Sequence, residues 1–116
     1  MKLLYHPDRE EIHLSSVLYA LSDPVRLLIV SELSRIGESA CGDIGLPVVK
    51  STVTHHTRTL REAGIIRTRA QGTQRFLSIR RDDLEYRFPG LLTSILEAFD
   101  SSEEAAKLRE AARNEE

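Results

Sequence analysis

The chain of 116 residues contains one cysteine and no tryptophan. A single cysteine excludes an intrachain disulfide framework and a self-contained zinc finger. The apolar stretches near the N-terminus are short and mixed with charge, unlike a signal peptide, so we expect a cytoplasmic protein with no membrane partner. Internal repeats and Pro- or Gly-rich linkers are also missing, which indicates a single domain.

Motifs typical of catalysis are missing as well. The sequence has no Gly-rich phosphate loop, no nucleophile elbow and no cluster of paired carboxylates. His55 and His56 are adjacent, so on a helix their side chains would point about 100° apart and could not chelate one ion together. We therefore expect no enzymatic activity, no metal site and no cofactor.

Hydrophobic residues make up 41% of the chain, as is usual for a folded globular protein. The net charge is −2, but its distribution is uneven. Residues 50–81 contain eight Lys or Arg and one carboxylate, a formal +7 that leaves −9 for the remainder. A cationic surface on an acidic body indicates a polyanionic partner, most simply nucleic acid. The alternative is a solvated cationic patch without a partner.

Residues 50–64 predict a helix with one buried side and one cationic side. Ser51 is the expected N-cap, and Gly64 is placed for a left-handed cap at the C-terminal end. The buried stripe is expected to comprise residues at helical spacing: Val53, Thr57, Leu60 and Ala63. The other side carries hydrogen-bonding and cationic side chains: Thr52, Thr54, His55, Arg58 and Arg61.

Three helices are predicted before this one. Residues 10–22 have a wide apolar face, and Asp23-Pro24 is a start signal for a second helix that continues to Gly37. A short third helix is expected over residues 39–44, before Gly45 and Pro47. A short helix, a brief turn and a capped polar helix are together typical of a helix-turn-helix.

After Gly64 the pattern changes to alternation. Residues 65–69 and 76–80 predict two strands joined by a loop over residues 70–73, in which Gly72 can take positive φ. Such a hairpin after a helix-turn-helix is a wing, which can follow the phosphate backbone or enter the minor groove. The wing residues expected to contact DNA are Gln71, Thr73, Gln74 and Arg75.

The last ordered helix is predicted to begin near Phe88-Pro89. Because a chain this small can hardly bury the apolar stripes of its first and last helices, we expect these helices to form a homodimer interface. The interface residues would be Leu14, Val17, Leu18, Leu91, Leu92, Ile95, Leu96 and Phe99. The alternative is that both stripes pack within one chain. Residues 101–116 form a charged tail that either extends as a helix or frays.

The run ALSDPVRLLIVSEL resembles the second-helix signature of the ArsR (ArsR/SmtB) family, and STVTHHTRTLREAGII with RAQGTQRFLSI resembles that family's recognition helix and wing. The resemblance covers roughly residues 18–79. It implies a mainly α fold with a small β-hairpin, a winged helix-turn-helix in the order α-α-α-α-β-β-α over residues 1–100. It also implies a homodimeric repressor that binds an inverted-repeat operator in double-stranded DNA and releases it on an unknown signal.

Each side chain of the recognition helix has an expected role. Base edges in the major groove would be contacted by Lys50, Ser51, Thr52, Thr54 and His55. Arg58, one turn after Thr54, is placed to hold a phosphate. His56 either donates to a phosphate or fastens the helix to its neighbour. Thr57 stands where the family has a core leucine.

The residues do not match the family's metal-binding pattern. In the segment Glu38–Ile44, Cys41 falls between the two metal-binding places, which hold Ala40 and Gly42, and no histidine follows His56. One thiolate cannot complete a soft-metal site. Two alternatives to a ligand-released repressor stay open: a thiol-based redox sensor that uses Cys41, and a winged-helix module that binds protein rather than DNA.

Overall fold

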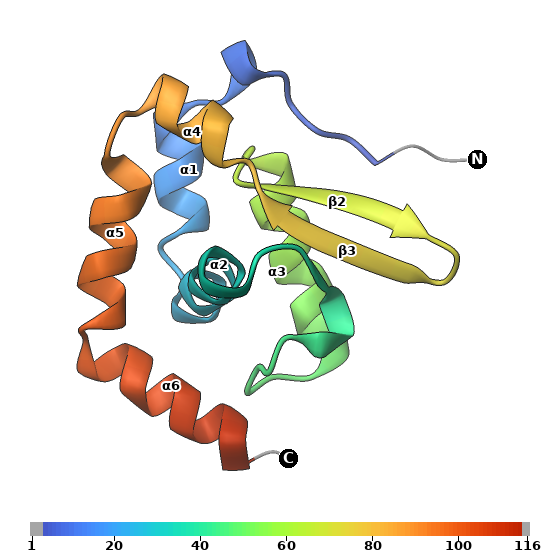
Figure 1. Cartoon of the computed structure of the whole chain (residues 1–116), viewed down its shortest axis with the longest axis vertical. Helices are drawn as coiled ribbons and strands as arrows, with labels where there is room; N and C mark the ends of the chain where they lie inside the picture. Colours follow the sequence, from blue (N-terminus) through green and yellow to red (C-terminus); the bar gives the residue numbers. More distant parts are fainter. Residues whose placement is uncertain (1–3, 115–116) are drawn as a thin grey trace.

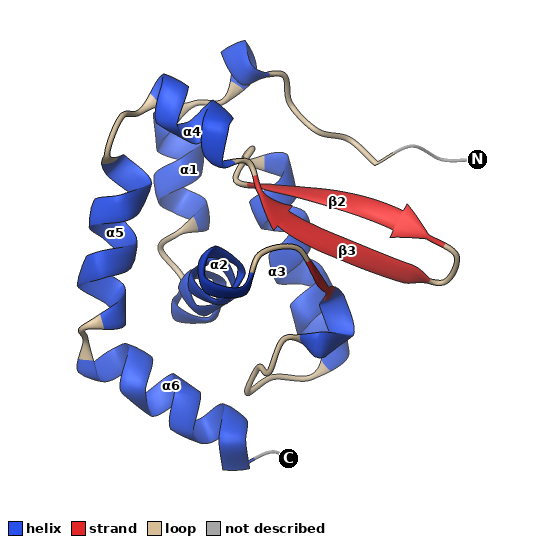
Figure 2. Cartoon of the chain, viewed as in Figure 1, coloured by secondary structure: helices blue, strands red, loops and turns tan. Residues whose placement is uncertain are grey.

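The computed structural model describes residues 4–114 (Figures 1 and 2). The helices are α1 (Leu14–Ala20), α2 (Pro24–Ile36), α3 (Lys50–Glu62), α4 (Arg81–Arg87), α5 (Leu91–Asp100) and α6 (Glu103–Asn114). The strands are β1 (Ser39–Ala40), β2 (Ile66–Gln71) and β3 (Gln74–Ile79), and two 3-10 turns are η1 (Arg9–Glu11) and η2 (Cys41–Asp43). The mainly helical fold with a small hairpin that the sequence predicts is confirmed.

Helix α2 runs through the centre of the molecule, with α1, α3, α5 and α6 around it (Figure 1). Its start agrees with the sequence prediction, because Asp23 caps the amides of Val25 and Arg26 and Pro24 is the first helical residue. The first predicted helix is shorter than expected. The chain between η1 and α1 leaves helical geometry so that Ile12, only 1% exposed, can enter the core.

Helix α3 ends as the sequence predicts but begins differently. Gly64 has φ +89°, the Ile65 amide bonds to the Leu60 carbonyl, and the Gly64 amide bonds to the Arg61 carbonyl, which is a Schellman motif. A Cβ at Gly64 would lie 2.6 Å from Ile12 Cγ1, so this position also needs glycine for space. Ser51 is not the N-cap: Val49 is, without a side-chain cap.

The predicted third helix over residues 39–44 is wrong. Residues 39–40 instead form β1, which pairs with β3, and only the single 3-10 turn η2 follows before the chain enters α3. The physical reason is that Ser39 and Ala40 extend the sheet, which takes the order β1-β3-β2. The helix-turn-helix therefore has a one-turn first element, and α3 is held mainly by α1, α2 and β2.

The wing is a tighter hairpin than predicted. Gln71 pairs with Gln74, so the loop is the two residues Gly72 and Thr73 rather than four. Gly72 has φ +62°, as the first central residue of a type II′ turn requires. The strands are longer than predicted, and the hairpin projects away from the helices (Figure 2).

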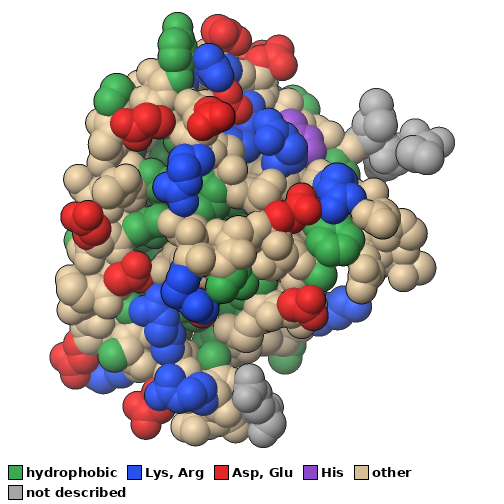
Figure 3. All heavy atoms as spheres, in the orientation of Figure 1, with side chains coloured by type: hydrophobic (Ala, Val, Ile, Leu, Met, Phe, Trp, Pro, Cys, Tyr) green, Lys and Arg blue, Asp and Glu red, His purple; other side chains and the backbone are tan. Residues whose placement is uncertain are grey.

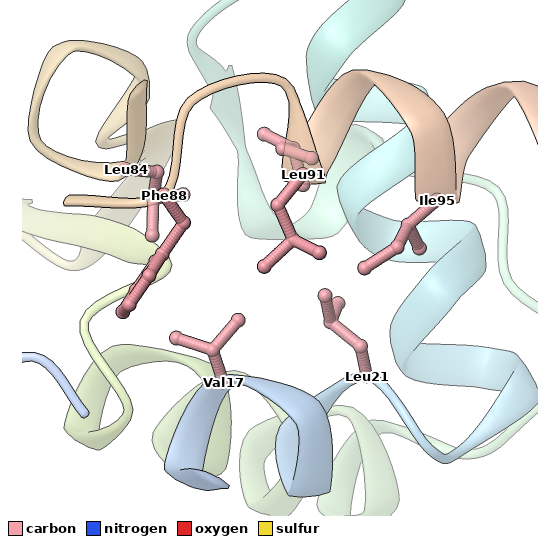
Figure 4. A pocket seen from close by; sticks show the side chains of 7 residues that line it. Val17, Leu21, Leu84, Phe88, Leu91 and Ile95 are labelled. Carbon is pink, nitrogen blue, oxygen red and sulfur yellow. The ribbon is translucent and has the colours of Figure 1, made fainter. Parts of the chain in front are cut away.

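Most of the predicted dimer interface is buried within one chain. Val17 and Leu21 lie opposite Leu84, Phe88, Leu91 and Ile95 (Figure 4), and only about 10 Å³ of free volume separates them. The other predicted interface residues on α5, Leu92, Leu96 and Phe99, are at most 7% exposed. The expectation that a single chain could not cover these stripes is wrong for α5 and for Val17, whereas Leu14 and Leu18 of α1 stay exposed. The sequence prediction had missed α4 and left α6 open, and these two helices supply part of the cover.

Helix α6 is docked on α2 rather than frayed. Ala105 is fully buried against Leu28 and Phe99. A polar cluster reinforces the contact, because Ser31 Oγ donates to Asp100 at 2.5 Å and Arg109 donates to both groups.

No single helix within residues 4–114 is long and apolar enough to cross a membrane. Helices α1 and α2 reach that length and apolarity only as a pair bent by 101°.

Candidate nucleic-acid interface

The exposed side of α3 offers several hydrogen-bonding groups that the fold leaves unused. The amides of Lys50 and Ser51 have no acceptor within the described residues, because the helix begins there without a side-chain cap. The hydroxyls of Ser51 and Thr52 also have no partner in residues 4–114. Free amides at a helix N-terminus are suited to phosphate oxygens.

The other hydroxyls of α3 are already committed to the helix. Thr54 Oγ1 donates to the Lys50 carbonyl at 3.1 Å, and Thr59 Oγ1 donates to the His55 carbonyl at 3.2 Å. An exposed Thr54 can therefore accept a hydrogen bond or present its methyl group, but it has no free proton for a phosphate. His55 is exposed beside it.

The eight cations of residues 50–81 separate into two groups. Arg80 Nε lies 2.9 Å and Arg67 3.9 Å from Asp83, while Arg69 lies 3.0 Å from Glu38. Arg81 donates to Ser34 Oγ at 2.8 Å. The cations whose charged group has neither a carboxylate nor a side-chain hydroxyl partner in the described part of the chain are Lys50, Arg58, Arg61 and Arg75. On the face seen in Figure 3, cationic and acidic side chains are interspersed.

Asp83 is the centre of the paired group and was missed by sequence reasoning. Arg9 donates to one of its oxygens at 2.8 Å and Arg80 to the other at 2.9 Å. The hydrogen bond from Arg9, followed by that from Arg80, lowers the pKa of Asp83 although burial opposes the shift. Its position, after a strand and two residues beyond Arg81, gives no sequence signal for these partners.

The tip of the wing is polar and exposed. Gln71, Thr73, Gln74 and Arg75 are all exposed, as expected for groups that can meet DNA. Arg69, one of the cations of the wing, behaves differently: it stacks 4.7 Å from the Phe76 ring centroid and bonds to both Glu38 and Gln71. This arginine stabilises the hairpin instead of facing outward freely.

His56 does not reach the exposed surface. It is 7% exposed, and Arg26 NH1 lies 3.1 Å from its Nδ1, while its Nε2 is 3.9 Å from Asp23. Of the two roles that the sequence left open, this geometry matches fastening to the neighbouring helix and not a phosphate contact. Thr57, on the same buried side, donates to the Thr54 carbonyl.

An N-terminal segment over residues 4–8 lies against the base of the interface, which the sequence did not indicate. His6 Nε2 accepts from the Thr68 amide at 3.0 Å, and Arg61 Nε donates to the Tyr5 carbonyl at 3.1 Å. Burial lowers the pKa of His6, and the nearby cations Arg61, Arg80 and Arg67 lower it further. Arg61 is thus partly occupied by the protein itself.

Cys41 lies in η2 and is half buried. Burial raises the pKa of its thiol, although Lys50 and Arg75 act in the opposite direction. A raised pKa disfavours the thiolate, which is the reactive form. Within residues 4–114, no three His, Cys, Asp or Glu side chains are grouped so as to hold a metal ion.

The chain is similar to known proteins in sequence and in fold. It is 37% identical over 84 residues to YceK, an uncharacterized HTH-type transcriptional regulator of Bacillus subtilis, covering 70% of this chain and 84% of YceK. It is 33% identical over 70 residues to MJ1325, an uncharacterized HTH-type transcriptional regulator of Methanocaldococcus jannaschii. This match covers 59% of this chain and 79% of MJ1325. The crystal structure of an ArsR family transcriptional regulator superposes with a TM-score of 0.59 at 24% identity, over 84% of this chain and 99% of that one. No protein-family model matches.

Proposed function

Because this chain belongs to the HTH-type transcriptional regulators and has the winged helix-turn-helix fold of an ArsR family member, we propose that it is a sequence-specific repressor of transcription, released from DNA by a signal. The observation that carries the proposal is the coincidence of unpaired cations with free amides and hydroxyls. The free amides and hydroxyls lie in the first turn of α3, and the unpaired cations lie along α3 and at the tip of the wing.

In the proposed complex, the N-terminal half of α3 enters the major groove. Ser51, Thr52, Thr54 and His55 face base edges, where a threonine can accept a hydrogen bond or contact a thymine methyl. Lys50 donates to a guanine or to the backbone, and Arg58 holds a phosphate. Gln71, Thr73, Gln74 and Arg75 of the wing contact the neighbouring backbone or minor groove.

Selection of bound duplexes from a random pool with the purified protein tests this function. The proposal predicts enrichment of an inverted repeat whose half-sites are about one helical turn apart or a multiple of it. The same experiment with His55→Ala and Thr52→Ala should alter base preference within each half-site. Failure to enrich any sequence, even at low salt, would overturn sequence-specific binding.

We also propose a homodimer, which an inverted repeat requires, but through a smaller surface than the sequence suggested. Leu14 and Leu18 remain exposed on one side of α1, one turn apart, at 46% and 47%. These two side chains are the part of the predicted interface still available to a second copy. Apolar groups exposed together on one helix face are suited to self-association.

The dimer is tested by analytical ultracentrifugation of Leu18→Ser beside a matched control, Ile36→Ser. Both residues are 47% exposed, but Ile36 lies at the end of α2. Dimerisation through α1 predicts a weaker self-association for the first variant only. Equal behaviour of the two variants, or a monomeric parent protein at micromolar concentration, would contradict it.

The geometry favours neither alternative activity. A thiol sensor would need a stabilised thiolate, whereas burial raises the pKa of Cys41. A winged helix that binds only protein would leave the unpaired cations of α3 and the wing unexplained. We propose no catalytic role, no cofactor, and a cytoplasmic location beside the DNA.

A further inference from the structure

Arg26 occupies an unusual place for an arginine. It is the third residue of α2 and only 7% exposed, and its charge lies near the helix N-terminus, where the helix dipole disfavours a cation. It forms no ion pair within residues 4–114. The cost of removing this guanidinium from water must therefore be offset by contacts other than an ion pair.

The groups around Arg26 join three helices. Its Nε donates to the Ala20 carbonyl at the end of α1 at 2.6 Å, and its guanidinium lies 5.6 Å from the Tyr19 ring centroid. Its NH1 lies 3.1 Å from Nδ1 of His56, in the middle of α3. Nε2 of the same imidazole faces Asp23, the N-cap of α2, at 3.9 Å.

This arrangement requires a neutral imidazole. A guanidinium has donors only, so Nδ1 of His56 must accept, and the ring proton sits on Nε2 toward Asp23. A second proton would place two donors and two positive charges face to face in a mostly buried site. Burial lowers the pKa of His56; Asp23 acts against this shift, while Arg26 and His55 add to it.

We propose that neutral His56 is a positioning residue that fastens the recognition helix to α1 and α2 through Arg26, so that protonation of its imidazole loosens α3 and weakens DNA binding. This inference rests on the proposed function, since α3 is taken as the DNA-contacting helix. Thr52, one turn before His56, is the nearest of the proposed base contacts on that side, and its placement depends on the same helix orientation.

The two histidines of α3 lie in different surroundings. His55 is exposed and faces the proposed DNA side. His56 is buried and faces Arg26, so its protonation breaks a hydrogen bond. The proposed loss of affinity in acid is therefore assigned to His56.

The test is fluorescence anisotropy with a duplex taken from the random-pool selection, from about pH 7.5 down to about pH 5.5, a range that spans the ordinary histidine pKa. The expected result for the parent protein is a loss of a few-fold in affinity, because the lowered pKa of His56 leaves the imidazole only partly protonated at the acid end of this range. His56→Gln keeps an acceptor for Arg26 and a donor for Asp23 but does not titrate. It should bind within a few-fold of the parent at neutral pH and lose no affinity in acid.

Two further variants separate the contributions. His55→Gln should retain the acid loss, and His6→Gln should retain it too, because the imidazole of His6 contacts β2 and not α2. An acid loss that persists in His56→Gln, or that is absent from the parent protein, would overturn the proposal. Absence of DNA binding at neutral pH would instead overturn the proposed function.

Discussion

Two regions of the molecule hold similar numbers of cations but use them differently. The open region, comprising Lys50, Arg58, Arg61 and Arg75 on α3 and the wing, has no carboxylate partner within residues 4–114. In the paired region, Asp83 is surrounded by Arg9, Arg67 and Arg80, and Glu38 holds Arg69. The difference shows that local charge density alone does not identify a binding surface. What distinguishes the two is where the carboxylates from distant parts of the chain are placed.

The largest effect is expected from the paired region. Asp83→Asn leaves Arg80, 6% exposed, without its anion, and we expect a loss of roughly 2–4 kcal/mol in the free energy of unfolding, as for other broken buried pairs. Chemical denaturation at neutral pH measures this loss. The DNA affinity of the folded Asp83→Asn variant should change little, whereas a substitution in the open region should lower DNA affinity.

Acid sharpens the same test. The pKa of Asp83 is lowered in the folded state. Its contribution to the free energy of unfolding is therefore fully present above its unfolded pKa and is lost as the pH falls through the folded pKa. The stability difference between the parent and Asp83→Asn should therefore shrink below about pH 4. A difference that stays constant down to acid unfolding would show that the ion pairs are not its source.

The next largest effect belongs to the open region. Arg75→Ala should weaken binding by roughly tenfold on every duplex sequence and flatten the salt dependence of affinity by about one unit of slope. Arg69→Ala is the matched control, because Arg69 lies in the same hairpin but is paired with Glu38. Anisotropy titrations across salt concentrations measure both. Equal changes in the two variants would erase the distinction between the regions.

A smaller effect is expected where the open region meets base edges. Thr52→Val removes a hydroxyl that has no partner in the described structure but keeps the side-chain shape. We expect an altered base preference at one position, equivalent to about 1 kcal/mol, with an unchanged salt slope. Sequencing of selected duplexes gives the preference. A uniform loss across all sequences would instead place Thr52 on the backbone.

The smallest effect is expected at Cys41, which borders the open region near Lys50 and Arg75. Because burial raises the pKa of its thiol, Cys41→Ser should change DNA affinity by less than about twofold, with or without mild oxidant. Loss of binding by the parent protein in oxidant, absent from the serine variant, would establish the thiol sensor.

Features specified by neighbouring residues were predictable from the sequence. The start of α2 at Asp23-Pro24, the glycine cap at Gly64 and the hairpin follow from local backbone preferences. The third helix was not predictable, because residues 39–40 pair with β3, which lies far along the chain. The dimer surface was overestimated for the same reason, since α4 and α6 cover stripes that look unpartnered in sequence.

The site divides along the same line. Exposed polar residues of α3 and the wing were identified from helical and strand periodicity. The buried role of His56 depends on Arg26, thirty positions away, and the pairing of Arg69 depends on Glu38. Neither partner can be inferred from spacing, so the count of eight cations overestimated the free charge of the interface.

The slope of affinity against salt, with the stoichiometry measured on the same duplex, tests the central claim most directly. Four unpaired cations predict a slope of about −3 to −4 per bound chain, since each neutralised phosphate contributes about −0.9. A slope of about −7 per chain would mean that the paired arginines also engage phosphate. That result, or the absence of any binding to duplex DNA, would contradict the account.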